Sequence, residues 1–185
     1  MASALVTGGT SGIGHAFAVE FASRGTDLVL VARDADRLER VAAELREVHG
    51  IEVETISADL AVRDDVMRVA DRIEDPARPI DWLINNAGFG LHSTVLDRSE
   101  IDIQARAFDV MCLAVLILGG AAGRAMRARG SGRIVNVAST SAAIYTGNYS
   151  AVKAWARTYS TALQLELRGT GVTVTGLLPG WVRTE

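Results

Sequence analysis

Cysteine, aromatic side chains and metal-binding clusters are all scarce in this sequence. Its single cysteine, Cys112, cannot form an internal disulfide and is compatible with a reducing compartment, so we predict a cytoplasmic protein. Aromatic residues make up only 5%, whereas Ala, Val, Leu and Gly are plentiful, a bias that suits helices packed closely on a parallel sheet. His, Cys and Asp side chains nowhere show the spacing of metal ligands, so we predict no bound metal.

An excess of charge of one sign and long apolar runs are absent as well. The formal net charge is -3, and no block of lysine and arginine favours nucleic acid or an anionic membrane surface. The apolar run at 112–118 is far too short to span a bilayer and predicts a buried helix instead. Met1-Ala2-Ser3 lacks the basic region of a signal peptide. We therefore expect no nucleic-acid partner and no membrane span.

Short β-branched runs alternate with segments in which apolar residues recur every three to four positions. The 185 residues have the length of one α/β domain. Strands are predicted at Ala4–Thr7, Asp27–Ala32, Glu52–Ser57, Trp82–Asn85, Arg133–Ala138 and Val172–Leu178. This alternation predicts an α/β fold: a doubly wound parallel sheet, covered by helices on both faces, in a single domain over residues 1–185.

A glycine-rich segment, Thr7–Gly14, ends the first predicted strand and opens a helix. Glycines let the backbone turn sharply and approach a pyrophosphate, and a helix N-terminus offers free N–H groups and a positive dipole end. A glycine cluster alone is often only a tight turn. Its place after the first strand of a βαβ unit favours a dinucleotide site instead.

Further motifs follow in order along the chain. They are Asp59-Leu60 after the third predicted strand, N-N-A-G at Asn85–Gly88, Ser139 after the fifth strand, Y-x-x-x-K at Tyr149–Lys153 and P-G-x-V-x-T at Pro179–Thr184. Together with the T-G-x-x-x-G-x-G loop, they resemble the short-chain dehydrogenase/reductase family over residues 4–184. The resemblance implies a Rossmann-type fold without that family's C-terminal part, and an NAD(P)-dependent oxidoreductase.

The resemblance also implies which residues form the site. Catalysis is expected from Ser139, Tyr149 and Lys153, and the family's aspartate, here Asp59, contacts the adenine. Cofactor contacts are expected at Gly8, Thr10, Ser11, Gly12, Ile13, Gly14, Arg33, Asp59, Leu60, Asn86, Ala87, Gly88, Tyr149, Lys153, Pro179, Gly180, Val182 and Thr184.

Chemical reasoning supports the roles of Tyr149, Lys153 and Ser139. Reduction of a carbonyl needs a hydride donor and a proton donor, and a free tyrosine, with a pKa near ~10, is a poor base at neutral pH. Lys153 lies one helical turn from Tyr149 and, with the oxidised nicotinamide, should favour the phenolate, so that Tyr149 acts as general acid or base. Ser139 can donate a hydrogen bond to the substrate oxygen. The structural alternatives are a surface Tyr–Lys pair and a serine turn or cap.

The end of the second predicted strand bears on the choice of cofactor. An acid there binds the ribose 2′-hydroxyl of NAD, whereas an arginine accommodates the 2′-phosphate of NADP. Arg33 stands at that position, and Asp34 after it is expected to cap the next helix. We therefore expect NADP(H), with NAD(H) as the alternative. Against this, Ser11 stands where many NADP-preferring relatives carry a second basic residue.

Three features depart from the family pattern. Met111 stands where the family usually has an asparagine of its proton relay, so that a neighbour or water must replace it or activity is impaired. Ser139 lies ten residues before Tyr149, a spacing shorter than the family's, which leaves Ser141 as a rival for the hydroxyl role. The family continues beyond the position of Glu185, and a polypeptide that ended there would be expected to bind substrate weakly and to be less stable.

The substrate, partners and competing functions are less sharply indicated. Side chains near the motifs suggest an apolar carbonyl or secondary alcohol: Leu91, His92, Tyr145, Asn148 and Trp181. The resemblance implies a homo-oligomer formed by the helices near 99–129 and 149–169. Two alternatives stay open. One is a dinucleotide-binding module with little catalytic activity, which Met111 favours, and the other is an epimerase or dehydratase, whose G-x-x-G-x-x-G loop is missing here.

Overall fold

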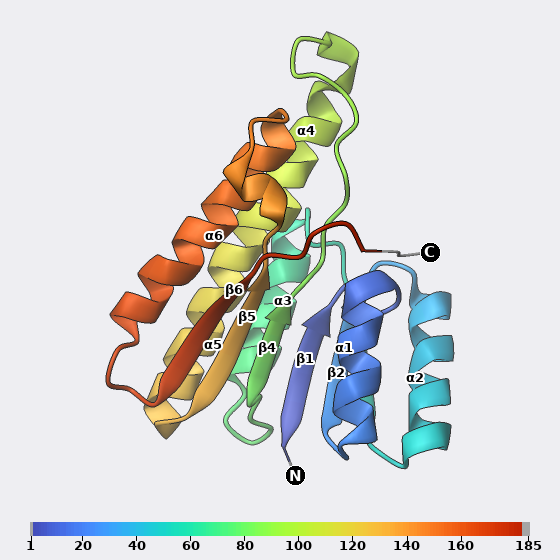
Figure 1. Cartoon of the computed structure of the whole chain (residues 1–185). Coiled ribbons are helices and arrows are strands. Elements are labelled where there is room, and N and C mark those ends of the chain that lie inside the picture. Colours follow the sequence, from blue (N-terminus) through green and yellow to red (C-terminus); the bar gives the residue numbers. More distant parts are fainter. Residues whose placement is uncertain (1, 183–185) are drawn as a thin grey trace.

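Six apolar runs form one parallel sheet in the computed structural model, which describes residues 2–182 (Figure 1). The strands are β1 (Ser3–Thr7), β2 (Asp27–Ala32), β3 (Val53–Ser57), β4 (Trp82–Asn85), β5 (Gly132–Val137) and β6 (Val172–Leu177). Their order is β3-β2-β1-β4-β5-β6, and every neighbouring pair is parallel. The α/β doubly wound fold predicted from the sequence is confirmed.

The ends of four predicted strands differ from the observed ones by one residue. β1 starts at Ser3, one residue early, and β3 starts at Val53, one residue late. β5 runs from Gly132 to Val137 rather than from Arg133 to Ala138, and β6 ends at Leu177 rather than Leu178. Backbone pairing sets these limits, for example where Ser3 pairs with Asp27, and the apolar pattern does not report that pairing.

The described residues form six α-helices, of which five cover the two faces of the sheet and α4 extends beyond its carboxyl edge (Figure 1). They are α1 (Gly12–Ser23), α2 (Ala35–His49), α3 (Arg63–Glu74), α4 (Ile101–Phe108), α5 (Ala114–Arg129) and α6 (Asn148–Glu166). α1 and α2 lie on one face, and α3, α5 and α6 lie on the other. The short helices η1 (Arg98–Glu100), η2 (Asp109–Leu113, a π-helix) and η3 (Thr140–Ala143) join them.

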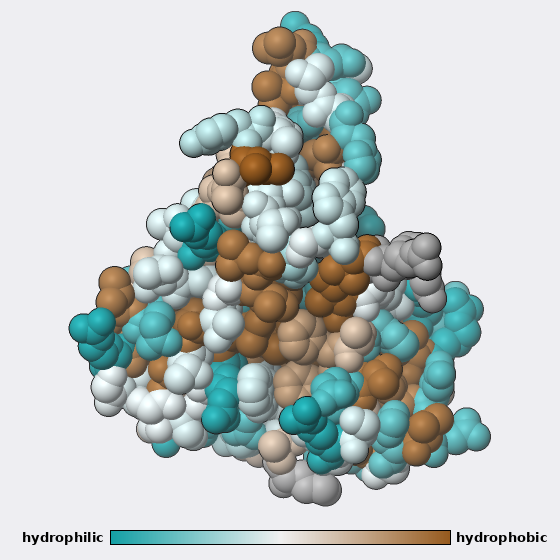
Figure 2. Space-filling model, in the orientation of Figure 1, coloured by the Kyte–Doolittle hydropathy of each residue, from teal (hydrophilic) through white to brown (hydrophobic). Residues whose placement is uncertain are grey.

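Two apolar cores follow from the alternation of side chains along the strands. In β1, Ala4 and Val6 belong to the core under α1 and α2, whereas Leu5 belongs to the core under α3, α5 and α6. Both cores hold buried residues on strands near the centre of the sheet, such as Ile84 and Leu83 of β4. In Figure 2 apolar side chains gather over the middle of the face between α6 and α1. The strand order reverses between β1 and β4, which places a crevice for ligands there.

The helices η1, α4, η2 and α5 follow one another directly and form one helical run over residues 98–129. By length and composition it is apolar enough to cross a membrane, but 56% of its most apolar window is buried inside the molecule. Core helices of soluble proteins pass the same test. Cys112, Ala114 and Leu118 belong to the core on the α3 side, as the prediction of a buried helix requires, and we interpret the run as a core helix.

Candidate active site

The glycine loop between β1 and α1 is shaped by close backbone approach. Gly8 has a φ of +66°, and a Cβ on Gly14 would collide with the Gly8 carbonyl and the Asn86 side-chain amide. The Nδ2 of Asn86 donates hydrogen bonds to the carbonyls of Thr7 and Gly8 at 3.0 and 3.2 Å. Thr7 Oγ1 accepts from the N–H groups of Asn86 and Ala87, both at 3.0 Å. The loop is therefore held against the end of β4, with its backbone exposed to a ligand.

Thr7 is a site residue that the sequence reasoning missed. Its hydroxyl is buried and joins β1 to the N-N-A-G motif over a separation of 79 residues or more. The signal was present, because Thr7 directly precedes the glycines of the T-G-x-x-x-G-x-G loop. Its role is to position Asn86 and Ala87, which themselves line the site.

A pocket of about 360 Å³ opens in front of the loop, at the carboxyl ends of the central strands. It brings together predicted residues from five separate motifs. These are Gly8, Ser11, Gly12, Ile13, Asn86, Ala87, Gly88, Ser139, Tyr149, Lys153, Pro179, Gly180 and Val182. Phe89, Gly90, Val137 and Ala138 also line it and directly adjoin the motifs. Thr184, also predicted to contact the cofactor, lies outside the described residues.

Ser139, Tyr149 and Lys153 converge from η3 and α6. Ser139 Oγ caps η3 by accepting from the Ser141 N–H at 3.1 Å, and it is also hydrogen-bonded to the Tyr149 hydroxyl. Lys153 Nζ lies 5.7 Å from the centroid of the Tyr149 ring and donates to the Val137 carbonyl at 2.9 Å. Ser139 is thus both the helix cap and the partner of the tyrosine, and Ser141 contributes only its backbone to that arrangement.

Burial shifts the pKa values of both Tyr149 and Lys153. Burial raises the pKa of Tyr149, and the hydrogen bond from Ser139 only partly offsets this. Burial lowers the pKa of Lys153 to about 8, while the Cys112 thiol acts in the opposite direction. In the protein without cofactor, Tyr149 is therefore held as the neutral phenol, the form that donates a proton.

Met111 fills the space beneath Gly88. It lies in the π-helix η2 and is only 2% exposed. A Cβ on Gly88 would lie 2.9 Å from Met111 Sδ and 3.7 Å from Lys153 Nζ. A thioether is at most a weak hydrogen-bond acceptor and has no proton to relay. At the position predicted to match the family's relay asparagine, an apolar side chain therefore packs against Gly88 in the wall of the 360 Å³ pocket.

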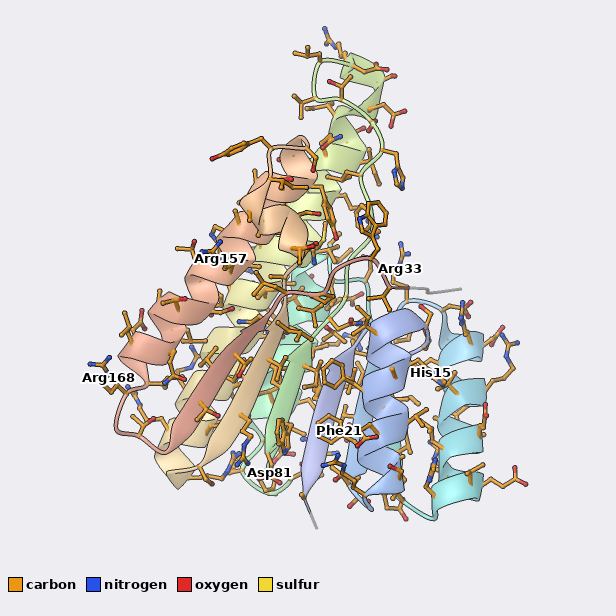
Figure 3. The ribbon with its side chains drawn as sticks, viewed as in Figure 1. His15, Phe21, Arg33, Asp81, Arg157 and Arg168 are labelled. Carbon is orange, nitrogen blue, oxygen red and sulfur yellow. The ribbon has the colours of Figure 1, made fainter. Side chains whose placement is uncertain are left out.

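A second pocket, of about 550 Å³, continues from the loop across the ends of β2 and β3. It contains the predicted residues Gly8, Thr10, Ser11, Arg33, Asp59, Leu60, Ala87 and Gly88. Arg33 lies at the carboxyl edge of the sheet (Figure 3), and Asp34 caps α2 through the Arg37 N–H, as predicted. Arg37 and Arg106 also line the pocket and were missed, because their place near Arg33 and Asp59 depends on folding.

The Asp59 carboxylate is paired with Arg106 of α4. Arg106 Nη2 donates to Oδ1 and Oδ2 at 2.8 and 2.7 Å, and the Ala61 N–H donates to Oδ1 at 3.0 Å. Burial raises the pKa of Asp59, but Arg106, the Ala61 amide and Arg33 outweigh it and hold this pKa below its usual value. The carboxylate is therefore ionised and fixed at the pocket wall.

The residues suggested for substrate binding are not brought into the catalytic pocket. Tyr145 and Trp181 are fully exposed, and Asn148 donates to Gln104 Oε1 at 3.0 Å. Leu91 and His92 also lie outside the walls of the 360 Å³ pocket in the described part of the chain. A larger groove of about 900 Å³ between α1, α2 and the end of β6 holds none of Ser139, Tyr149 and Lys153. The candidate site is therefore identified by the residues that line the 360 Å³ pocket, and not by the volume of the groove.

A glycine loop before a helix N-terminus, at the point where the strand order of a parallel sheet reverses, defines the dinucleotide-binding class of doubly wound proteins. Within that class, a family model described as short chain dehydrogenase matches residues 2–185. The chain belongs to the short-chain dehydrogenase/reductase family.

Solved structures and curated proteins resemble the whole chain. A short-chain dehydrogenase from Sphingobium yanoikuyae, solved in complex with NADPH, is 37% identical with a TM-score of 0.95, over 100% of this chain and 73% of that one. An uncharacterized oxidoreductase of Staphylococcus saprophyticus is 34% identical over 98% of this chain and 78% of its own length. The very-long-chain 3-oxoacyl-CoA reductase of Bos taurus is 33% identical, and the chain spans 60% of its length.

Proposed function

We propose that this protein is an oxidoreductase that transfers a hydride between NADP(H) and a carbonyl or secondary alcohol substrate. The observation that carries the proposal is the convergence of Ser139, Tyr149 and Lys153 in the pocket that the glycine loop also lines. The NADPH complex of the Sphingobium relative and the keto-reductase name of the bovine relative support the cofactor and the reaction type.

The residues that line the two pockets fit the phosphate groups of NADP(H). The loop between Gly8 and Gly14 is packed so closely that a Cβ on Gly14 would collide with the Gly8 carbonyl, and it lies at the N-terminus of α1, where an anion is favoured. Arg33, with Arg37 of α2 in the same pocket wall, would hold the 2′-phosphate of NADP(H). Lys153 would bind the nicotinamide ribose, and Pro179, Gly180 and Val182 would close the nicotinamide side.

Proton transfer in this scheme is carried out by Tyr149. The bound cofactor supplies or accepts the hydride. In reduction, Ser139 donates a hydrogen bond to the carbonyl oxygen, and the neutral Tyr149 phenol gives that oxygen its proton. Burial suits this direction, because it keeps the pKa of Tyr149 above its ordinary value and the proton in place at neutral pH. Lys153 places a positive charge beside the phenolate that remains.

The cellular location, the substrate class and the oligomeric state are also part of the proposal, and they rest on the family resemblance. We place it in the cytoplasm, acting on a small carbonyl or alcohol, as a homo-oligomer. Three apolar helical side chains are exposed, Phe108 of α4 at 52%, Leu116 of α5 at 46% and Leu165 of α6 at 56%, which supports their burial by a second copy.

A titration with NADPH and NADH, followed by nicotinamide fluorescence, tests the cofactor site directly. Wild type should bind NADPH more tightly than NADH. Arg33→Ala should weaken NADPH binding by about 10-fold, since it removes a charge-assisted contact to the 2′-phosphate, and leave NADH nearly unchanged. Equal weakening of both dinucleotides would contradict the role of Arg33, and no binding by wild type would refute the proposed function.

Met111 favours a second candidate function, a dinucleotide-binding module with little chemistry. Its buried thioether adjoins Gly88 and Lys153 and offers no proton to a relay. NADPH oxidation with a panel of apolar ketones separates the two candidates. Tight binding of NADPH without turnover of any ketone would favour the module, whereas turnover that Tyr149→Phe abolishes would favour the oxidoreductase.

A further inference from the structure

Gln104 is a buried polar side chain on the helix that lies beside the start of α6. The chain leaves β4, rises as a loop to η1 and returns as α4, which lies against the first turns of α6 (Figure 1). The buried residues of α4 are Gln104, which is 3% exposed, and Ala107. A buried amide costs about 1–3 kcal/mol unless its hydrogen bonds are made, and an apolar side chain would fill the same space without that cost. The partners of the Gln104 amide therefore indicate what the residue does.

The Gln104 amide joins the loop after β4 to the first residue of α6. Its Nε2 donates to the Ser93 carbonyl at 2.9 Å and to Ser93 Oγ at 3.0 Å. Its Oε1 accepts from Asn148 Nδ2 at 3.0 Å. A backbone carbonyl can only accept, so the Ser93 carbonyl fixes which end of the amide faces the loop. The Oε1 end must then face α6, and Asn148 must present its Nδ2 to it.

Both partners of Gln104 adjoin the 360 Å³ pocket. Phe89 and Gly90 line the pocket, and they belong to the loop that Ser93 anchors to α4. On the other side, Asn148 is the first residue of α6 and directly precedes Tyr149. Gln104 itself is not among the described residues that line the pocket. Any effect of Gln104 on the reaction must therefore pass through the residues that it holds.

The start of α6 depends on contacts of this kind, because its N-cap residue has no side chain. That residue is Gly147, with a φ of +89°. Within the same segment, Ser150 Oγ accepts from the Thr146 N–H at 3.2 Å. The bond from Asn148 to Gln104 ties the first residue of α6 to α4. Helix ends open locally at little cost in free energy unless such contacts hold them.

We infer that Gln104 is a positioning residue for Tyr149 that acts through Asn148, an inference that rests on the proposed function. Gln104 holds the first turn of α6 and the loop at Ser93 in one fixed arrangement, and so keeps the phenol where it can protonate a carbonyl oxygen. A displacement of about 1 Å at a reacting group can cost about 10²-fold in rate. Loss of the Gln104 amide should therefore lower kcat and leave cofactor binding unchanged.

NADPH oxidation with acetophenone, cyclohexanone and 2-octanone measures this effect, with kcat expressed per NADPH-binding site so that unfolded protein is not counted. Gln104→Leu fills the space without hydrogen bonds and should lower kcat about 10-fold or more, with the Kd for NADPH within about 2-fold of wild type. Gln164→Leu is the matched control. Gln164 also lies on α6, about four helical turns from Tyr149, and accepts from the Val174 N–H at 2.6 Å. This control should lower the melting temperature and leave kcat unchanged.

Two further variants test the route through Asn148. Asn148→Ala removes the same hydrogen bond, so the double variant with Gln104→Leu should lose no more activity than Gln104→Leu alone. Gln104→Glu has the same shape, and its protonated carboxyl can still donate to Ser93 and accept from Asn148. The ionised carboxylate has no proton for the Ser93 carbonyl. Because burial raises the pKa of a carboxyl, kcat of Gln104→Glu relative to wild type should rise as the pH falls from about 8 to about 5.5.

The kcat per binding site separates positioning from a merely structural role. A kcat of Gln104→Leu within about 2-fold of wild type, with only a lower melting temperature, would overturn the inference. Effects of Gln104→Leu and Asn148→Ala that multiply in the double variant would overturn it too, because Gln104 would then act by another route. Where Gln104→Leu does not fold, as circular dichroism shows, Gln104→Glu decides: a ratio to wild type that is constant with pH overturns the inference, and one that rises at low pH supports it. Binding of NADPH by wild type without turnover of any of the three ketones would instead refute the proposed function and this inference with it.

Discussion

Replacing Lys153 with methionine is expected to stabilise the folded protein while it abolishes activity. Lys153 is 5% exposed, and burial lowers its pKa from the ordinary value of 10.5 to about 8. At 1.36 kcal/mol for each pKa unit, the buried ammonium costs about 3 kcal/mol at neutral pH. Methionine has a similar length and no charge, so this cost disappears. The Val137 carbonyl loses its hydrogen bond from Nζ, and this loss reduces the stabilisation by about 1 kcal/mol.

The net gain of about 2 kcal/mol should raise the melting temperature by about 4–8 °C at pH 7, given the usual scaling for a chain of this size. The gain depends on pH. Because the folded-state pKa of Lys153 lies below the unfolded value, the unfolded chain binds more protons between about pH 8 and 10.5, and wild-type stability rises with pH over that window. The advantage of Lys153→Met should therefore shrink from pH 8 to pH 10.5.

Chemical denaturation of wild type and Lys153→Met at pH 7, 9 and 10.5 measures this difference, and other titrating groups cancel between the two proteins. Lys153 is the only lysine in the sequence. Selective ¹³C labelling of lysine therefore gives a single side-chain Cε resonance, whose titration reports the pKa directly. A stability difference independent of pH, or an NMR titration near the ordinary value of 10.5, would refute the reasoning.

Three further substitutions test the site. Gly14→Ala should cost about 1–3 kcal/mol in stability and weaken NADPH binding more than about 10-fold, because the new Cβ meets the Gly8 carbonyl. A melting curve identical to that of wild type would contradict this. Tyr149→Phe should lower kcat by about 10²–10⁴ and leave the Kd for NADPH within about 2-fold, and retained turnover in a ketone assay would exclude Tyr149 as the acid. Met111→Asn should raise kcat and lower the free energy of unfolding by about 1–3 kcal/mol, because it buries a polar amide. An unchanged kcat would show that Met111 does not limit proton transfer.

Several features were readable from the sequence because they are local. Strand and helix alternate with distinct apolar periods, so the six strands and the parallel sheet could be predicted. The Asp34 cap of α2 depends on a residue three positions away, and it too was predicted correctly. Motifs in a fixed order gave the family, which the match over residues 2–185 confirms.

Other features depend on contacts between distant segments and became visible only in the folded molecule. Arg106 pairs with Asp59 across 47 residues, and Thr7 binds the N-N-A-G motif across about 80. The sequence places no weight on Arg106, since an arginine on an amphipathic helix is ordinarily a solvated residue. Tyr145 and Trp181 looked equally plausible as pocket residues, yet both side chains point into solvent.

The sequence by itself determined which chemical groups the site contains: a glycine loop, a serine, a tyrosine, a lysine and an arginine at the end of the second strand. The tertiary structure decided the pKa values of the tyrosine and the lysine. Burial raises the pKa of Tyr149 and lowers that of Lys153, opposite to the simple expectation for a neighbouring pair, because removal from water opposes the charged form of each. Desolvation is a property of everything that packs around a residue, and only the fold brings those surroundings together.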